Sequence, residues 1–345
     1  GLLGYARNFP ELVALFFVAV LGVGAFHPAS AAAVGQLAGR KRSALISVFF
    51  LFGMIGGIMG NVLSPLYVHA AGVMSGEAGE AATEAGLRAL VWFIPPGLVA
   101  AAALAWAINK APHRHHDAHD HHASLPADER RRRWTAVWVL YVGNVIRFTV
   151  NQMLVYLVIE WIERLTRAHA GVDKLDVALG QHASELNGPL QASMQVGMGF
   201  GALGLGFMLT GRHEKKAFVL IPLIGVAAIV AFPFTDHLLG AGRWAVLVPA
   251  GLLAVVAGFG FGALVPVSMS LGQRLLPHRT SLASGLLLGG AWCVAFIGPQ
   301  IARAIHRGVD ANLEPGFFTA AGLLVAASLL SLALPGRLIR ETAPH

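Results

Sequence analysis

The sequence has 345 residues, of which 56% are hydrophobic and only 12% are charged. This composition excludes an ordinary soluble domain, in which about a quarter of the residues carry a charge. The formal net charge of +7 fits basic loops that face anionic lipid and gives no reason to expect a nucleic-acid partner. A single cysteine, Cys293, excludes an intramolecular disulfide. We therefore expect an all-α, multi-pass membrane protein.

Nine apolar stretches are long enough to cross a bilayer, whose hydrocarbon core of about 30 Å needs roughly 20 helical residues. Each stretch predicts one membrane-spanning helix. In chain order they are 11–37, 44–68, 87–108, 134–159, 187–210, 217–234, 244–271, 281–304 and 315–335.

The lysine and arginine residues of the connections predict the orientation of these helices. Sixteen of them fall on one side of the expected bundle and eight on the other. Because short cytoplasmic loops carry the excess of basic residues, the first side is expected to be cytoplasmic. This orientation places residue 1 outside and the C-terminus in the cytoplasm.

A repeated pattern divides the chain. The run from Gly22 to Ser30 has the order G-x-G-A-x-x-P-x-S, which returns from Gly260 to Ser268. Each copy leads through a short basic turn into a glycine-rich apolar stretch that ends in proline. Two copies in the same direction are typical of transporters whose halves are related by an axis along the membrane normal. We therefore expect a fold of two helix bundles.

The repeat also predicts the domain boundaries. Its second copy is followed by one more apolar stretch, so the first copy corresponds to the fourth and fifth helices of a six-helix half. We expect residues 1–108 to be helices four to six of an N-terminal bundle, residues 109–134 a cytoplasmic loop, and residues 135–345 a complete six-helix bundle. Three further helices are then expected upstream of residue 1. The alternative is a natural protein with nine spans.

The first copy of the repeat resembles a known family. The Phe-His-Pro tripeptide within Gly22 to Ser30, the basic turn 39–42 and the run from Gly56 to Pro65 are similar to the fourth and fifth helices of major facilitator transporters, most closely the fosmidomycin-resistance branch. The resemblance implies a twelve-helix, two-bundle fold in the bacterial inner membrane. It also implies efflux of a drug or small polar metabolite in exchange for protons, by alternating access.

Two departures limit what the resemblance implies. Ser64 replaces the glycine of the usual Gly-Pro pair, which the second copy keeps at Gly298 and Pro299. The turn 211–216 keeps only the basic character of the family's turn motif. The histidine and aspartate that the family is expected to use for proton coupling would lie upstream of residue 1, so proton coupling rests on the resemblance alone.

Glycines and prolines within the spans are the expected packing and conformational residues. Glycines four residues apart remove side chains from one helix face and let a neighbouring backbone approach closely. A proline inside a span frees a carbonyl, which is tolerated where that carbonyl faces protein or a wet cavity. The residues expected to act in this way are Gly22, Gly24, Pro28, Gly56, Gly57, Gly60, Pro65, Pro266, Gly298 and Pro299.

Arg147 lies near the middle of the stretch 134–159, where an arginine that faces lipid would cost at least about 2.5–3.5 kcal/mol. Asn144 and Asn151 lie three residues before it and four after it, on the same helical face. This stripe of one cation and two amides predicts contact with an anionic or strongly polar group of the substrate. The alternative is a structural arginine bound to helix-end carbonyls or to an acidic side chain of another helix.

Polar residues on two other stretches are further candidates. Gln191 and Gln195 follow Asn187 at four-residue spacing and share one helical face near the outer end of their span. They are expected either to line an outer vestibule or to form interhelical hydrogen bonds. His27 lies close to the centre of its span and can change charge near neutral pH, which makes it a candidate proton carrier. The alternative is a histidine held by hydrogen bonds.

The expected loop between the bundles contains six histidines and two aspartates within residues 113–122. Neutral imidazole binds borderline metals such as Zn²⁺, Ni²⁺ and Cu²⁺, although the spacing is not that of a closed site. The alternative is a flexible linker with adventitious metal affinity. The candidate ligands are His113, His115, His116, His119, His121 and His122.

No motif of an enzyme is present. The chain has no P-loop, no nucleophile with its base and no paired carboxylates within the spans, so we expect neither catalysis nor ATP-driven transport. The expected partners are a small-molecule substrate, protons and lipid. We expect no cofactor, and we expect the protein to be a monomer. Two other functions stay open: transport of a divalent metal or metal complex, which the histidine tract favours, and a scaffold or sensor without transport activity.

Overall fold

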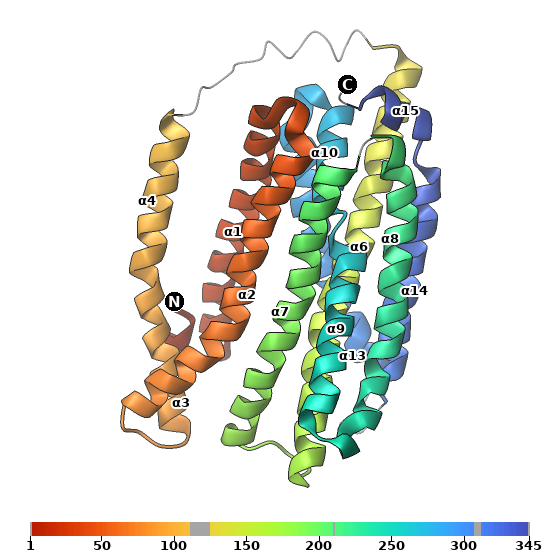
Figure 1. The fold of residues 1–345 in the computed structure, drawn as a ribbon. Helices are drawn as coiled ribbons and strands as arrows, with labels where there is room; N and C mark the ends of the chain where they lie inside the picture. The colour runs from red at the N-terminus through yellow and green to blue at the C-terminus, as the bar shows by residue number, and fades with distance from the viewer. Residues whose placement is uncertain (1, 111–124, 210, 307–311, 344–345) are drawn as a thin grey trace.

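The structure, a computed structural model, describes residues 2–110, 125–209, 211–306 and 312–343, and within these ranges it contains helices and no strand (Figure 1). Eight helical segments of the described chain are long and apolar enough to cross a membrane. They are Phe9–Ala38, Arg42–Met74, Glu80–Trp106, Ala127–Ala170, Gly211–His237, Trp244–Leu275, Pro277–Ile305 and Glu314–Ala333. This is the all-α, multi-pass membrane fold that the composition predicts.

The ninth predicted span, 187–210, corresponds to α7 (Val177–Met208). This helix runs beside the other long helices in Figure 1 but is not among the eight apolar segments. Polar side chains such as Gln191 and Gln195 lower its mean hydropathy. The position of α7 in the bundle therefore depends on hydrogen-bond partners for these polar side chains as well as on its apolar residues.

The first helix group comprises η1 (Leu2–Tyr5), α1 (Phe9–Ala38), η2 (Gly39–Lys41), α2 (Arg42–Met74), α3 (Glu80–Ala89), η3 (Leu90–Phe93) and α4 (Ile94–Lys110). Asn8 caps α1, since its side chain accepts a hydrogen bond from the backbone N–H of Glu11. At the other end of α1, Gly39 has a φ of 53°, which favours glycine and lets the chain turn into α2. Figure 1 shows α4 at the edge of this group.

The second helix group contains the remaining long helices, and two of its crossings are broken into shorter pieces. Its elements, besides α7, are α6 (Ala127–Ala170), α8 (Gly211–Ala231), η4 (Phe232–Ala241), α9 (Arg243–Gly262), α10 (Val265–Leu275), η5 (Pro277–Arg279), α11 (Thr280–Ser284), the π-helical turn η6 (Gly285–Gly290), α12 (Ala291–Ala295), α13 (Ile297–Ile305), α14 (Glu314–Leu330), η7 (Ser331–Ala333) and α15 (Gly336–Glu341). Pro266 lies in the first turn of α10, directly after the break between α9 and α10, whereas Pro28 lies inside the continuous α1. Prolines at matching repeat positions thus act differently on their helices.

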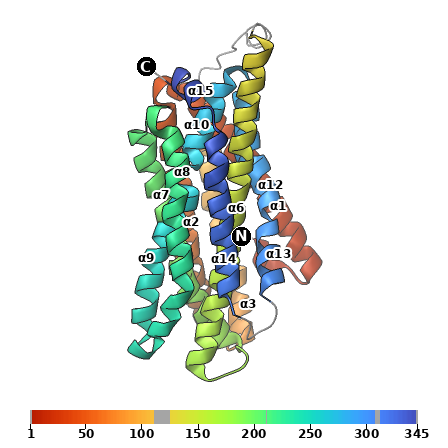
Figure 2. The ribbon, with the colours of Figure 1, turned by 90° about the vertical axis from the view of Figure 1, so that its right-hand side faces the viewer.

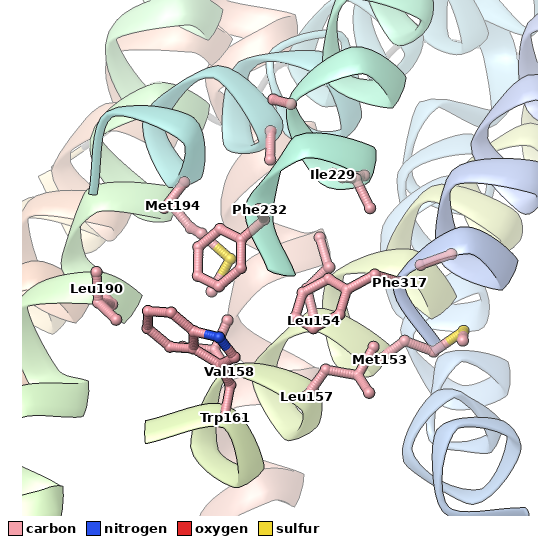
Figure 3. Packing of buried hydrophobic residues seen from close by; sticks show 14 of the residues in the cluster. Met153, Leu154, Leu157, Val158, Trp161, Leu190, Met194, Ile229, Phe232 and Phe317 are labelled. Carbon is pink, nitrogen blue, oxygen red and sulfur yellow. The ribbon is translucent and has the colours of Figure 1, made fainter. Parts of the chain in front are cut away.

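Side chains of α6, α7, α8, η4 and α14 form a continuous core within the second group (Figure 3). The Trp161 ring centroid lies 5.0 Å from that of Phe232, which in turn stacks on Phe317 at 5.2 Å. Lipid tails are as apolar as these side chains, so close packing, more than removal from water, favours association of the helices.

The two ends of the bundle differ in their connections. The turn 39–42 and α15 lie at one end, and α3 lies at the other, in both views (Figures 1 and 2). We call the first the basic end, because of Arg42, Arg274 and Arg279, and the second the opposite end. The sequence predicts that the basic end is cytoplasmic.

Candidate functional site

The two helix groups meet along α2 and α7, and we call this contact the seam (Figure 1). A Cβ atom on Gly188 of α7 would lie 2.3 Å from the carbonyl oxygen of Asn61 on α2. From the other side, a Cβ atom on Gly57 of α2 would lie 2.5 Å from Gln195 Oε1. Gly188 therefore lets the two backbones approach closely, and Gly57 makes room for the end of the Gln195 side chain.

At the basic end, α1 is hydrogen-bonded to the second helix group. Gln273 of α10 is fully buried, and its Nε2 donates to the Ala31 carbonyl oxygen at 3.2 Å and to Ser284 Oγ at 2.8 Å. A Cβ atom on Gly35 would lie only 1.8 Å from Gln273 Oε1. Gly35 therefore makes the space that the glutamine amide occupies between the two groups.

A hydrogen bond between α1 and α11 also joins the two helix groups. Nε2 of Gln36 donates to Thr280 Oγ1 at 2.7 Å. Nε of Arg42 donates to the Gly35 carbonyl oxygen at 2.9 Å, which fixes the turn that follows α1. We call the whole set the closure; its members are Ala31, Gly35 and Gln36 of α1 with Gln273, Thr280 and Ser284 of α10 and α11.

A buried ion pair anchors α10 next to the closure. Arg274 pairs with Glu214 of α8, and their side chains are 8% and 4% exposed. Removal of one partner from such a buried pair typically costs about 3–5 kcal/mol, because the other charge stays buried. The second helix group therefore presents Gln273 from a fixed position.

Gln273, Thr280 and Ser284 are not among the residues predicted from the sequence, although the repeat contains a signal for Gln273. Gly35 and Gln273 each stand thirteen residues after the first glycine of the repeated motif, at Gly22 and Gly260. In parallel halves related by an axis along the membrane normal, corresponding residues near that axis face each other. A glycine opposite a glutamine at one repeat position is the pattern that indicates this contact.

Asn144 of α6 binds the crossing that contains the π-helical turn. Its Nδ2 donates to Ser268 Oγ at 2.8 Å and to the Leu287 carbonyl oxygen at 2.9 Å. The same turn contacts α1, since a Cβ atom on Gly289 would lie 3.3 Å from Pro28 Cγ. Short π-helical segments frequently occur at functional sites. This one contacts α6 on one side and the first helix group on the other.

Arg147 lies in the interior of the second helix group. Its Nη1 lies 3.4 Å from Asn144 Oδ1, its Nη2 lies 3.4 Å from Ser331 Oγ, and its guanidinium carbon lies 5.4 Å from the centroid of the Phe218 ring. Nε is buried without a hydrogen-bond partner, and no described carboxylate forms an ion pair with this arginine. The structure thus brings Arg147 and Asn144 together, among residues of α8 and η7. Asn151 is also buried on α6, and contact of this stripe with a substrate stays a prediction.

The glutamines of α7 have different surroundings. Nε2 of Gln191 donates to Asn187 Oδ1 at 3.1 Å and to the Val155 carbonyl oxygen of α6 at 3.2 Å, so this residue forms an interhelical hydrogen bond. Gln195 points into the seam against Gly57, and its Oε1 is buried without a hydrogen-bond partner. Of the two, only Gln195 reaches the contact between the helix groups.

His27 faces α2 from the middle of α1. Its Nδ1 lies 3.1 Å from the Val23 carbonyl oxygen, one turn earlier in the same helix. Its ring lies 5.5 Å from Phe26 and 6.2 Å from Phe49 of α2. These contacts agree with the alternative of a locally hydrogen-bonded histidine, and its role as a proton carrier stays a prediction.

The predicted packing glycines fall into two sets. Gly57 and Gly298 are closely approached, the latter by the Thr149 carbonyl oxygen, to which a Cβ would lie at 2.5 Å. A Cβ atom on the remaining glycines would meet no other group within 4 Å; they are Gly22, Gly24, Gly56 and Gly60. For these four, the described residues show none of the close backbone contact that the sequence predicts. Pro65 lies inside α2 and Pro299 inside α13.

The histidine tract, His113 to His122, lies outside the described residues. Among the residues that the structure does describe, no group of three or more histidine, cysteine, aspartate or glutamate side chains could hold a metal ion. α6 begins at Ala127, before the boundary of 134 that the sequence predicts for the loop.

The seam is also tied at the opposite end. Nδ1 of His69 on α2 lies 2.7 Å from Gln181 Nε2 and 3.5 Å from Glu185 Oε1, both on α7. His69 and Gln181 line a cleft of about 270 Å³ between α2, α3 and α7. The two helix groups therefore contact each other over the whole length of the seam in this structure.

Comparison with known proteins places this geometry in context. The sequence profile of the Major Facilitator Superfamily matches residues 1–299, which covers the seam, the closure and the π-helical turn. No match to an individual curated protein was found.

Proposed function

The chain belongs to the Major Facilitator Superfamily, a family of secondary transporters, and on this premise we propose that it is a proton-coupled exporter of a drug or small polar metabolite. In this proposal, the seam and the closure separate and rejoin during alternating access. The proposal keeps the direction and the coupling ion that the resemblance to the fosmidomycin-resistance branch implies.

The observation that carries the proposal is the closure. It joins the helix groups at the basic end by neutral hydrogen bonds from Gln273 and Gln36, with no ion pair among its members. Interhelical hydrogen bonds in membranes contribute only about 0.6–2 kcal/mol each. A contact of this strength holds one arrangement and can still be broken in each transport cycle.

Few of the predicted substrate-binding residues lie where the two helix groups meet. Gln195 is the predicted substrate residue that reaches the seam, and its buried oxygen has no partner among the described residues. We assign it contact with a hydrogen-bond donor of the substrate. Arg147 receives a supporting role in this proposal, because its contacts lie within the second helix group.

Transport by everted membrane vesicles tests the proposal. The protein is produced from its whole reading frame, and the vesicles are energised so that their interior becomes acidic. Uptake of labelled fosmidomycin above that of control vesicles is expected, and a protonophore should abolish it. Uptake that is indifferent to the protonophore would exclude proton coupling, and absence of uptake would exclude this drug as the substrate.

A further inference from the structure

Glu160 and His306 form a pair at the opposite end of the second helix group. Glu160 lies in the C-terminal part of α6, and His306 is the C-terminal cap residue of α13. Nε2 of His306 lies 3.8 Å from Glu160 Oε2. This separation is too long for a hydrogen bond of a neutral imidazole, but it is an ion-pair distance once the ring carries a second proton.

Because His306 is buried, a charge on its ring has a large effect on the stability of its contacts. Its side chain is only 8% exposed, and its Nδ1 is buried without a hydrogen-bond partner among the described residues. A charged imidazole in such surroundings is costly unless an anion faces it. Glu160 supplies that anion and is 27% exposed. Glu160 is therefore the more exposed member of the pair.

Neighbouring groups add to this arrangement. Tyr156 of α6 lies near enough to Glu160, Glu163 and Arg303 to interact electrostatically with all three. The backbone carbonyls at the C-terminal end of α13 favour a cation, so they stabilise a protonated His306. The positive charge of Arg303 on α13 opposes that effect.

Two arginines of α6 in this region pair with other carboxylates. Arg167 pairs with Glu163 at 3.7 Å within α6. Arg164 points instead to Asp236 of η4, at 4.0 Å. Among the described carboxylates, that of Glu160 is the one within ion-pair distance of His306.

The crossing that leads to His306 also carries part of the closure. It runs over Pro277–Ile305, with Thr280 and Ser284 near the basic end. Asn144 of α6 binds this crossing at the π-helical turn, about halfway along it. A change in the contact between α6 and the end of α13 thus acts on a segment whose other end holds the two helix groups together.

From this geometry we propose that Glu160 and His306 form a proton-binding site that stabilises the arrangement closed at the basic end. With the proton bound, imidazolium and carboxylate form an ion pair that ties α13 to α6. When the proton leaves to water, a neutral imidazole faces the carboxylate, the attraction is lost and the crossing is free to shift. The inference rests on the proposed proton-coupled transport and assigns to it a site that binds the proton.

Proton binding is measured first, without any substrate. The purified protein is titrated over about pH 5 to 8, the range in which histidine changes charge. His306→Gln is expected to take up about one proton fewer per molecule than the wild type over this range. Glu160→Gln, which removes the carboxylate that faces His306 and keeps every histidine, tests the pair itself and should also take up less proton over this range. Proton uptake equal to that of the wild type in either variant would overturn the assignment.

Transport measurements distinguish a loss of proton coupling from a loss of folded protein. In proteoliposomes, Glu160→Gln and His306→Gln are expected to lose drug accumulation driven by a pH gradient and to retain exchange of labelled for unlabelled fosmidomycin without a gradient. Glu84→Gln, which removes a carboxylate from an exposed ion pair at the same end, should retain both. Normal accumulation by the two variants, or loss of exchange as well, would overturn the proposal. If wild-type transport ignores the pH gradient, the proposed function fails, and the titration still decides whether the pair binds a proton.

Discussion

The two helix groups differ in how much of their apolar surface the chain itself covers. In the most apolar part of each span, 56% of the residues are buried in Ala127–Ala170 and 50% in Gly211–His237. The corresponding fraction is 11% in Arg42–Met74 and zero in both Phe9–Ala38 and Glu80–Trp106. Within the described residues, the second group is therefore a bundle that packs on itself, and the first group has its closest contacts with the second along α2 and α7.

This difference shows where the chain concentrates its specific contacts. α1 exposes large apolar side chains along much of its length, yet Ala31 and Gly35 at its basic end are buried against α10 and α11. An apolar helix face is satisfied by lipid, whereas a polar contact between helices needs matched partners. The closure and the seam are the contacts that require particular residues.

The largest expected effect comes from the seam. Gly188→Val forces a side chain into the Asn61 carbonyl, and overpacking of this kind typically costs about 1–3 kcal/mol or more. We expect a marked loss of folded protein. Gly180→Val changes the same residue type in the same helix, where a Cβ meets nothing within 4 Å, and should be tolerated. Size-exclusion profiles and thermal unfolding of both variants test this, and equal stability of the two variants would show that close packing at Gly188 does not hold the seam together.

The closure gives the next largest effect. Gly35→Val displaces the Gln273 amide and removes hydrogen bonds that together contribute about 1–3 kcal/mol, which corresponds to a shift of roughly 5–150-fold between the closed and open arrangements. We expect folded protein whose basic end opens. In a Cys293→Ser background, alkylation of Ala32→Cys should become faster. Gly22→Val is the control on the same helix, because a Cβ there meets open space, and the same acceleration in this control would contradict the role of the closure.

Variants of Arg147 test whether this residue stabilises the second helix group or contacts the substrate. Arg147→Ala removes the guanidinium contacts to Asn144 Oδ1 and Ser331 Oγ and is expected to destabilise the protein by about 1–3 kcal/mol. Arg147→Lys should restore part of the stability, because an ammonium cannot reproduce the forked donors of a guanidinium. Thermal unfolding and transport are measured together. Full stability of Arg147→Ala with loss of transport would instead support the substrate contact that the sequence predicts.

The smallest effect is expected from the histidine tract. Replacement of all six of its histidines by serine should leave transport unchanged and abolish retention of Zn²⁺ or Ni²⁺ by the purified protein, because imidazole is the ligand that binds these metals. Loss of transport that depends on added metal would favour the alternative of a metal transporter.

Much of the fold follows from the sequence. Hydropathy predicts the long helices, because a chain in lipid has to satisfy its backbone hydrogen bonds within each span. The repeat from Gly22 to Ser30 and from Gly260 to Ser268 predicts corresponding segments in two halves. The sequence alone also identifies Asn144 and Arg147 as residues that avoid lipid, and both are buried.

The tertiary structure decided which groups those residues meet. Arg147 has amide, hydroxyl and aromatic neighbours from α6, η7 and α8, a set that no spacing along one helix indicates. Gln273 fits against Gly35 only because α10 and α1 come together at the basic end. Helical periodicity determines which face of a helix a side chain occupies. The partner on that face depends on how the helices are arranged, and a pattern within one helix does not contain that information.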